Sequence, residues 1–155
     1  MVDFVSKLRY DLDDLKKLMR ILRGPDGCPW DLEQTHKSIR DNLLEEAREV
    51  TEAIDSGISE DLLEELGDLL LQVVFHSEIA SEENSFTLDD VINATCKKLL
   101  RRHPHVFGNI KANNKTESLS IWNDIKQIEK YARAQGRRIS DMTVEEMEAL
   151  YHQMH

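Results

Sequence analysis

Two pairs of acidic residues stand in otherwise apolar helical sequence. Glu46 and Glu49 lie in LLEEAREV, and Glu65 and Asp68 lie in LLEELGDLLLQVVF. In each pair the i, i+3 spacing brings the two Cβ atoms to within roughly 5 to 6 Å of each other on a helix, so both carboxylates can bind one cation. Oxygen ligands favour Mg²⁺, Mn²⁺ or Ca²⁺ over zinc. The pattern therefore predicts one metal site built by two helices.

Helical periodicity places these carboxylates at the border between core and solvent. Glu46 falls inside one edge of the first apolar stripe, and Glu49 lies about 60° further round the helix. Glu65 and Asp68 flank the second stripe. The two stripes consist of Ile39, Leu43, Leu44, Ala47, Val50 and Ile54, and of Leu62, Leu66, Leu69, Leu70, Val73 and Val74. A bound cation would remove the cost of burying unpaired charges. The alternative is a solvated acidic face, because the chain has 30 Asp and Glu residues.

The elements that must position these side chains are all predicted to be helices. Amphipathic spacing and turn residues predict the first three at residues 3–22, from a cap at Thr35 or Ser38 to about residue 55, and at about residues 59–82. The next three run from a capping box at Thr87 and Asp90 through KKLLRR, over about residues 116–134, and from a capping box at Thr143 and Glu146 onward. No segment has the pattern of a strand longer than a few residues. The sequence therefore predicts an all-α fold built around an antiparallel helical bundle.

Length and charge limit the classes of protein to which the chain can belong. A chain of 155 residues suits a single domain over residues 1–155. The formal net charge of −10 disfavours binding to nucleic acid or to anionic membranes, so any phosphate chemistry near the acidic pairs needs a cation. The amphipathic, acidic start has no continuous apolar stretch, which favours a cytoplasmic location. Cys28 and Cys96 predict neither a disulfide framework nor a zinc site.

A second group of residues has the types that bind a nucleotide. Lys98 and Arg102 share one face of the fourth predicted helix, and Trp122 and Lys126 repeat the i, i+4 spacing on the next. Basic residues also favour a helix C-terminus through the macrodipole, and a single Trp at helical spacing is more often a core residue. In a metal-binding acidic chain, however, Lys and Arg can hold phosphates while an aromatic ring stacks on a base.

Several sequence blocks in the same order resemble the MazG family of nucleoside triphosphate pyrophosphohydrolases. The resemblance runs through GCPWDLEQTH, LLEEAREVTEAID, LLEELGDLLLQVVFH, KKLLRRHPHVFG and IWNDIK, and it covers roughly residues 15–128. The family pattern EExxE followed by ExxD is present as Glu45, Glu46, Glu49, Glu65 and Asp68.

The resemblance implies an all-α domain, completed by dimerisation, that hydrolyses NTP or dNTP to the monophosphate and pyrophosphate with Mg²⁺, for which Mn²⁺ could substitute. Position by position, it assigns the metal ligands to Glu46, Glu49, Glu65 and Asp68. It assigns the nucleotide contacts to Lys98, Arg102, Trp122 and Lys126.

Two further expectations concern Glu45 and the third predicted helix. Glu45 could orient the attacking water, but it points away from the apolar stripe and is more simply a solvated residue. The helix beginning near Ser59 is apolar on more faces than one partner helix can cover, which predicts a homodimer or a higher homo-oligomer.

Two other classes of protein stay open at this stage. A di-iron or di-manganese carboxylate bundle needs Glu-x-x-His from two helices, and Glu33 with His36 supplies the one such motif of the sequence. A non-catalytic helical dimerisation module would use the carboxylates only as surface charge.

Overall fold

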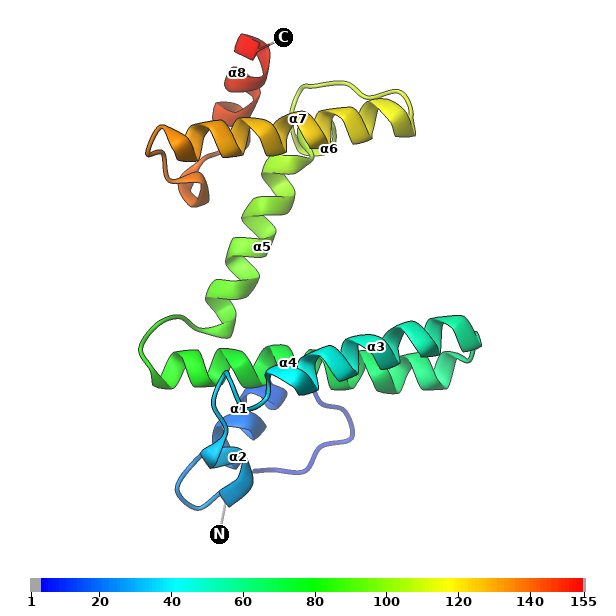
Figure 1. The fold of residues 1–155 in the computed structure, drawn as a ribbon, viewed down its shortest axis with the longest axis vertical. Coiled ribbons are helices and arrows are strands. Elements are labelled where there is room, and N and C mark those ends of the chain that lie inside the picture. Colours follow the sequence, from blue (N-terminus) through cyan, green and yellow to red (C-terminus); the bar gives the residue numbers. More distant parts are fainter. Residues whose placement is uncertain (1–3, 155) are drawn as a thin grey trace. The chain divides into compact units, whose positions relative to one another are not determined.

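Helices make up the regular structure of residues 4–154, the part of the chain that the computed structural model describes, and no strand occurs among them. They are α1 (Leu12–Leu22), α2 (Pro29–Glu33), α3 (Arg40–Ser56), α4 (Ser59–Glu82), α5 (Leu88–Arg102), α6 (Pro104–Phe107), α7 (Lys115–Ala134), the 3₁₀ turn η1 (Ile139–Asp141) and α8 (Val144–Met154) (Figure 1). The all-α fold class is confirmed. None of these helices is both long and apolar enough to cross a membrane.

The chain divides into two compact units, Met1–Leu88 and Asp89–His155. The single domain predicted for residues 1–155 stays a prediction. The acidic pairs belong to the first unit, and the predicted nucleotide contacts belong to the second.

In the first unit, α3 and α4 form a helical hairpin, with α1 packed against α4 (Figure 1). The hairpin turns at Gly57, whose φ of 71° lies in the left-handed region that glycine adopts without strain. The C-terminal half of α4 is buried against α1 and Ile39. This core comprises Met19, Ile39, Val74, Phe75, Ile79 and Leu88.

The part of α4 up to Val73 is less buried than the predicted stripe requires. Leu63, Leu66, Leu70 and Val73 are 76%, 50%, 44% and 38% exposed. Their spacing puts them along one side of α4. The prediction that Leu66, Leu70 and Val73 pack into a core is therefore wrong for this chain by itself, whereas Val74 is buried as predicted.

Helix α1 begins at Leu12, so the predicted start at residue 3 is wrong for the described residues, and residue 3 itself lies outside them. A capping box explains the boundary: the Asp14 amide donates to Asp11, and the Asp11 amide donates to Asp14. The amphipathic pattern continues through the residues before Asp11, so the pattern alone does not show that the helix begins at this cap. The capping box predicted at Thr143 and Glu146 is confirmed by the two reciprocal hydrogen bonds.

The GPDGCPWD loop is held to α4 by Arg23. Its guanidinium donates to both carboxylate oxygens of Glu82, at 2.8 and 2.7 Å, and to the backbone carbonyls of Asp31 and Gln34. It also lies over the Phe75 ring. One buried cation thereby holds the end of α2, a short helix that lies outside the predicted helices.

In the second unit, α7 packs against α8 around a core of Ile110, Ile121, Ile125, Ile128 and Met147. Glu148 of α8 accepts hydrogen bonds from the backbone amides of Asn109 and Ile110. A Cβ at Gly108 would overlap the Glu148 carboxylate, so a side chain at this position would displace that carboxylate. The last helix thus fixes the loop that follows α6.

Two imidazoles join the segment between α2 and α3 to α4. The Nδ1 atoms of His36 and His76 lie 2.8 Å apart, and Nε2 of His36 lies 3.8 Å from the Glu83 carboxylate. The two rings are nearly parallel. Burial lowers the pKa of His76, and the neighbouring His36 lowers it further. A hydrogen bond between two Nδ1 atoms needs one proton, so the pair does not tolerate a charge on both rings.

We therefore predict that this pair makes stability fall in mild acid. The folded-state pKa of His76 is below its unfolded value, so the unfolded chain binds more protons, and the free energy of unfolding decreases as pH falls from about 6.5. His76→Gln should cost about 1 kcal/mol at neutral pH, the usual value of a lost hydrogen bond. It should also flatten the pH dependence, as measured by urea unfolding between pH 8 and 5.

His152→Gln, which removes an exposed imidazole of α8, is the matched control and should leave the acid slope of the parent in place. Parallel pH profiles for the parent and His76→Gln would contradict the assignment of the slope to this pair.

Candidate functional site

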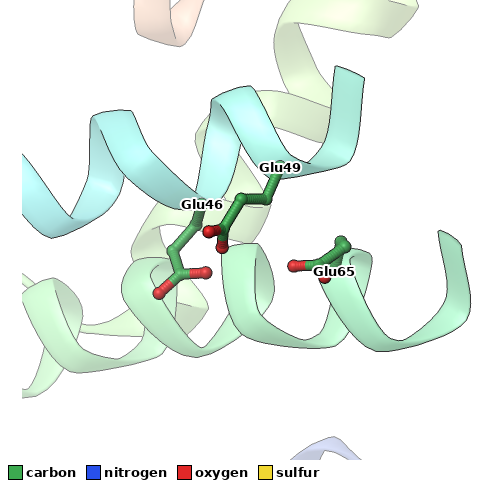
Figure 2. A group of neighbouring side chains, drawn as sticks. All are labelled: Glu46, Glu49 and Glu65. Carbon is green, nitrogen blue, oxygen red and sulfur yellow. The ribbon is translucent and has the colours of Figure 1, made fainter. Parts of the chain in front are cut away.

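Helices α3 and α4 bring three of the four predicted metal ligands together. Glu46 and Glu49 extend from adjacent turns of α3 toward α4, where Glu65 lies (Figure 2). Each offers one carboxylate oxygen, and these oxygens lie within 4.8 Å of one another. All three side chains are partly buried. The i, i+3 spacing within α3 and the close packing of the hairpin together make the cluster, which we call the carboxylate triplet.

Asp68 lies one turn after Glu65 on α4, outside the carboxylate triplet but close enough to act on its charge. It remains a predicted metal ligand. Glu45 is exposed on α3, which agrees with the expectation that it is solvated. Its part in catalysis also remains a prediction.

The carboxylates repel one another. Burial raises the pKa of Glu46, and the charges of Asp68, Glu49 and Glu65 raise it further. Burial also raises the pKa of Glu65, with Glu49 and Asp68 as the next causes. Among residues 4–154 no lysine or arginine forms an ion pair with these four groups. The charge at this place therefore favours either a bound proton or a bound cation.

The donor atoms fit a hard divalent cation. The triplet supplies only carboxylate oxygens, which suit Mg²⁺ and Mn²⁺ and do not select zinc. A cavity of about 340 Å³ adjoins it and is lined by Glu49, Glu52, Ala53, Ser56, Asp61 and Glu65. The cavity gives a small charged ligand access to the oxygens of Glu49 and Glu65.

The geometry does not support the di-iron alternative. His36, the histidine of the one Glu-x-x-His motif, bonds to His76 and is not a member of the carboxylate triplet. Such a centre would need histidines among the clustered carboxylates.

In the second unit, three of the four predicted nucleotide contacts lie together. The guanidinium of Arg102 lies 5.4 Å from the centre of the Trp122 ring, and Nζ of Lys126 lies 4.6 Å from it. Both distances are typical of cation–π contacts. Lys98 is exposed on α5. Arg102 is therefore not simply a solvated charge at a helix end, although the macrodipole also favours its position.

Trp122 also lines a cavity of about 350 Å³ in the second unit. The other lining residues are His103, His105, Lys115, Ser118 and Leu119. Because Trp122 is partly exposed, the interpretation of this residue as a purely buried core side chain does not hold. Its indole contacts two cations and forms part of a cavity wall.

Sequence reasoning missed Glu129, which is 3% exposed and binds both Arg101 and Arg102. A signal was present, because Glu129 follows Ile125 by four residues and thus shares the buried face of α7. A glutamate on such a face needs a cation, and KKLLRR was the nearest basic segment of the preceding helix.

Comparison with known proteins agrees with the family that the sequence resembles. Residues 34–107 match the model of the MazG nucleotide pyrophosphohydrolase domain, and this range contains the whole carboxylate triplet. It ends before Trp122 and Lys126.

Three relatives illustrate the similarity over a longer range. The chain is 47% identical over 125 residues to the nucleoside triphosphate pyrophosphohydrolase/pyrophosphatase MazG of Thermotoga maritima, covering 81% of this chain and 48% of that protein. It is 46% identical over 132 residues to the nucleoside triphosphate pyrophosphohydrolase of Escherichia coli K12, covering 84% and 50%. It is 46% identical over 123 residues to the uncharacterized protein YabN of Bacillus subtilis, covering 79% and 25%.

The chain thus spans half or less of the length of these relatives. The domain match and the level of identity show that the chain belongs to the MazG family.

Proposed function

We propose that this protein hydrolyses nucleoside or deoxynucleoside triphosphates to the monophosphate and pyrophosphate in a Mg²⁺-dependent reaction. The observation that carries the proposal is the carboxylate triplet, three partly buried acids that converge within a MazG domain. The relatives from T. maritima and E. coli are named as nucleoside triphosphate pyrophosphohydrolases, which supports the proposed class of reaction.

The proposed metal ligands are Glu46, Glu49, Glu65 and Asp68. When bound there, Mg²⁺ would lower the pKa of a water ligand and offset charge on the triphosphate. The chain contributes a fixed oxygen cluster, since two helices hold the side chains before any ligand arrives. Glu45 could orient the attacking water from the solvent side of α3.

The proposed nucleotide contacts are Lys98, Arg102, Trp122 and Lys126. Arg102 and Lys126 supply charge for phosphate groups, and both are held beside the Trp122 indole. The cavity of about 350 Å³ next to Trp122 is large enough for a nucleobase, which supports the indole as a stacking surface.

We further propose that the protein is a homodimer and acts in the cytoplasm. The exposed side of α4, formed by Leu63, Leu66, Leu70 and Val73, would be covered by a second copy. The net charge of −10 supports the absence of nucleic acid and anionic membrane from the set of partners.

The reaction itself is the first test. With a mixture of NTPs and Mg²⁺, we predict release of pyrophosphate as the direct product and loss of turnover in EDTA, restored by Mg²⁺ or Mn²⁺. Phosphorus NMR distinguishes pyrophosphate from orthophosphate. Full activity in EDTA, or orthophosphate as the first product, would refute the mechanism, and no hydrolysis of any nucleotide would favour the non-catalytic dimerisation module.

Function and stability should change in opposite directions at Glu46. The folded-state pKa of this carboxyl is raised, so its charge destabilises the metal-free fold once pH exceeds the normal glutamate range. We predict that Glu46→Gln is at least as stable as the parent without metal. Its turnover should fall at least about a hundredfold, since even groups that only orient metal ligands have effects of 10- to 100-fold.

Thermal melts with and without Mg²⁺, measured beside turnover, test this pair of effects. Mg²⁺ should raise the melting temperature of the parent, as a ligand of the native state does, and raise that of Glu46→Gln much less. Glu60→Gln makes the same charge change at an exposed position of α4 and should keep the response of the parent. A Glu46→Gln protein with parental turnover would show that the carboxylate is structural.

The exposed side of α4 gives a prediction about assembly. Light scattering should show a dimer for the parent, and Leu70→Lys should shift the mass toward a monomer, because it puts a charge into the proposed apolar contact. Leu8→Lys, at a fully exposed leucine before α1, should leave the dimer intact. A monomeric parent with full activity would contradict the proposed assembly.

A further inference from the structure

Glu129 is a buried carboxylate that binds two arginines at once. It lies on α7 and is 3% exposed. Its Oε1 accepts hydrogen bonds from Nε and Nη2 of Arg101, at 3.4 and 3.3 Å. Its Oε2 accepts from Nε and Nη2 of Arg102, at 3.2 and 2.7 Å. Each oxygen thus holds one guanidinium by the same edge.

The two arginines differ in their surroundings. The side chain of Arg101 is 6% exposed and that of Arg102 is 19% exposed. Arg101 therefore closes the buried side of the cluster, where Glu129 needs a charged partner. Arg102 is the one that reaches toward solvent.

Arg102 is fixed in two directions. Glu129 accepts hydrogen bonds from its Nε and Nη2 atoms, and its guanidinium carbon lies over the Trp122 ring. Lys126 contacts the same indole. A free arginine side chain would have to lose its rotamer freedom when a ligand binds, whereas this one is already held. No hydrogen bond of the described residues engages the remaining Nη1 atom of Arg102.

The cluster also has an excess of positive charge. Arg101 and Arg102 share one carboxylate, that of Glu129, and Lys126 contacts the same indole as Arg102. Glu129 therefore anchors Arg102 without neutralising the group as a whole, which leaves a local site for an anion.

We propose that Glu129 is a positioning residue that fixes Arg102 on Trp122 with its free donors directed at the phosphates of the substrate. This inference rests on the proposed function, because it assumes that Arg102 contacts the triphosphate. Glu129 itself does not touch the substrate. A buried ion pair that serves only the packing of α5 against α7 would have the same contacts in the free protein, so binding measurements must separate the two roles.

The test uses the full chain in a Trp30→Phe background, so that Trp122 is the one tryptophan left. Titration with inorganic tripolyphosphate and Mg²⁺, followed by Trp122 fluorescence, gives the dissociation constant. We expect Glu129→Gln to weaken binding about tenfold or more, by analogy with the groups that orient metal ligands. KM for NTP hydrolysis should rise by a similar factor.

A double-mutant cycle separates positioning from packing. In an Arg102→Ala background, Glu129→Gln should weaken tripolyphosphate binding no further, because the side chain through which it acts is gone. Glu148→Gln is the matched control: it removes another buried carboxylate charge of the second unit, far along the sequence from Arg102, and should lower stability without changing tripolyphosphate affinity.

Glu129→Gln leaves Arg101 buried without a charged partner and could unfold the second unit. If circular dichroism shows such unfolding, the same comparison is made between Arg101→Met and Arg101→Met with Glu129→Gln. Both of these variants lack the buried charge of Arg101. Glu129→Gln should weaken tripolyphosphate binding between them by the same factor as in the parent.

The outcomes distinguish this inference from the proposed function. If the parent hydrolyses NTP and Glu129→Gln binds tripolyphosphate as tightly as the parent, the positioning role is refuted while the function stands. An equal loss from Glu129→Gln in the presence and absence of the Arg102 side chain also refutes it. If Arg102→Ala itself leaves affinity unchanged, Arg102 is no phosphate contact, and the positioning role falls with it.

Discussion

Repulsion among the carboxylates of α3 and α4 is the constraint on which the first unit depends. Three acidic side chains converge there, and Asp68 adds its charge from the next turn. Nothing in the described chain neutralises them with a lysine or arginine, so the packing of the two helices must hold them together. The C-terminal half of α4 supplies that packing through Val74, Phe75 and Ile79, away from the acidic turns. One half of α4 therefore packs into the core, and the other half carries the acidic side chains.

The second unit has the opposite arrangement. Its buried carboxylate, Glu129, has two cationic partners, and its cations exceed its nearby anions. A cation bound in the first unit would reduce the repulsion among the carboxylates, and an anion bound in the second would reduce the repulsion among the cations. Each cluster therefore has its own electrostatic requirement, set by the residues of its own unit.

The sequence predicted most of the helices and the alignment of Glu46 with Glu49 because both depend on local spacing. The approach of this pair to Glu65 also needs the hairpin of α3 and α4. The bounds of α4 follow from apolar periodicity, and i, i+3 spacing aligns Glu46 with Glu49. The start of α1 was missed because a single capping box at Asp11 outweighs the amphipathic pattern before it. The His36–His76 and Arg102–Glu129 contacts were missed because they join residues 40 and 27 positions apart, which no local pattern determines.

The exposure of α4 follows from the same division of the helix. Leu63, Leu66 and Leu70 lie beside the acidic turns and are not part of the core that α4 forms with Met19 of α1. In an isolated chain, polar side chains at these positions would cost less free energy of solvation than leucines. The leucines therefore favour contact between this half of α4 and another apolar surface. If a second copy supplies that contact, it would also lower the dielectric around the carboxylates and strengthen their hold on a cation. Assembly and metal binding would then favour each other, because both act on the less packed half of one helix.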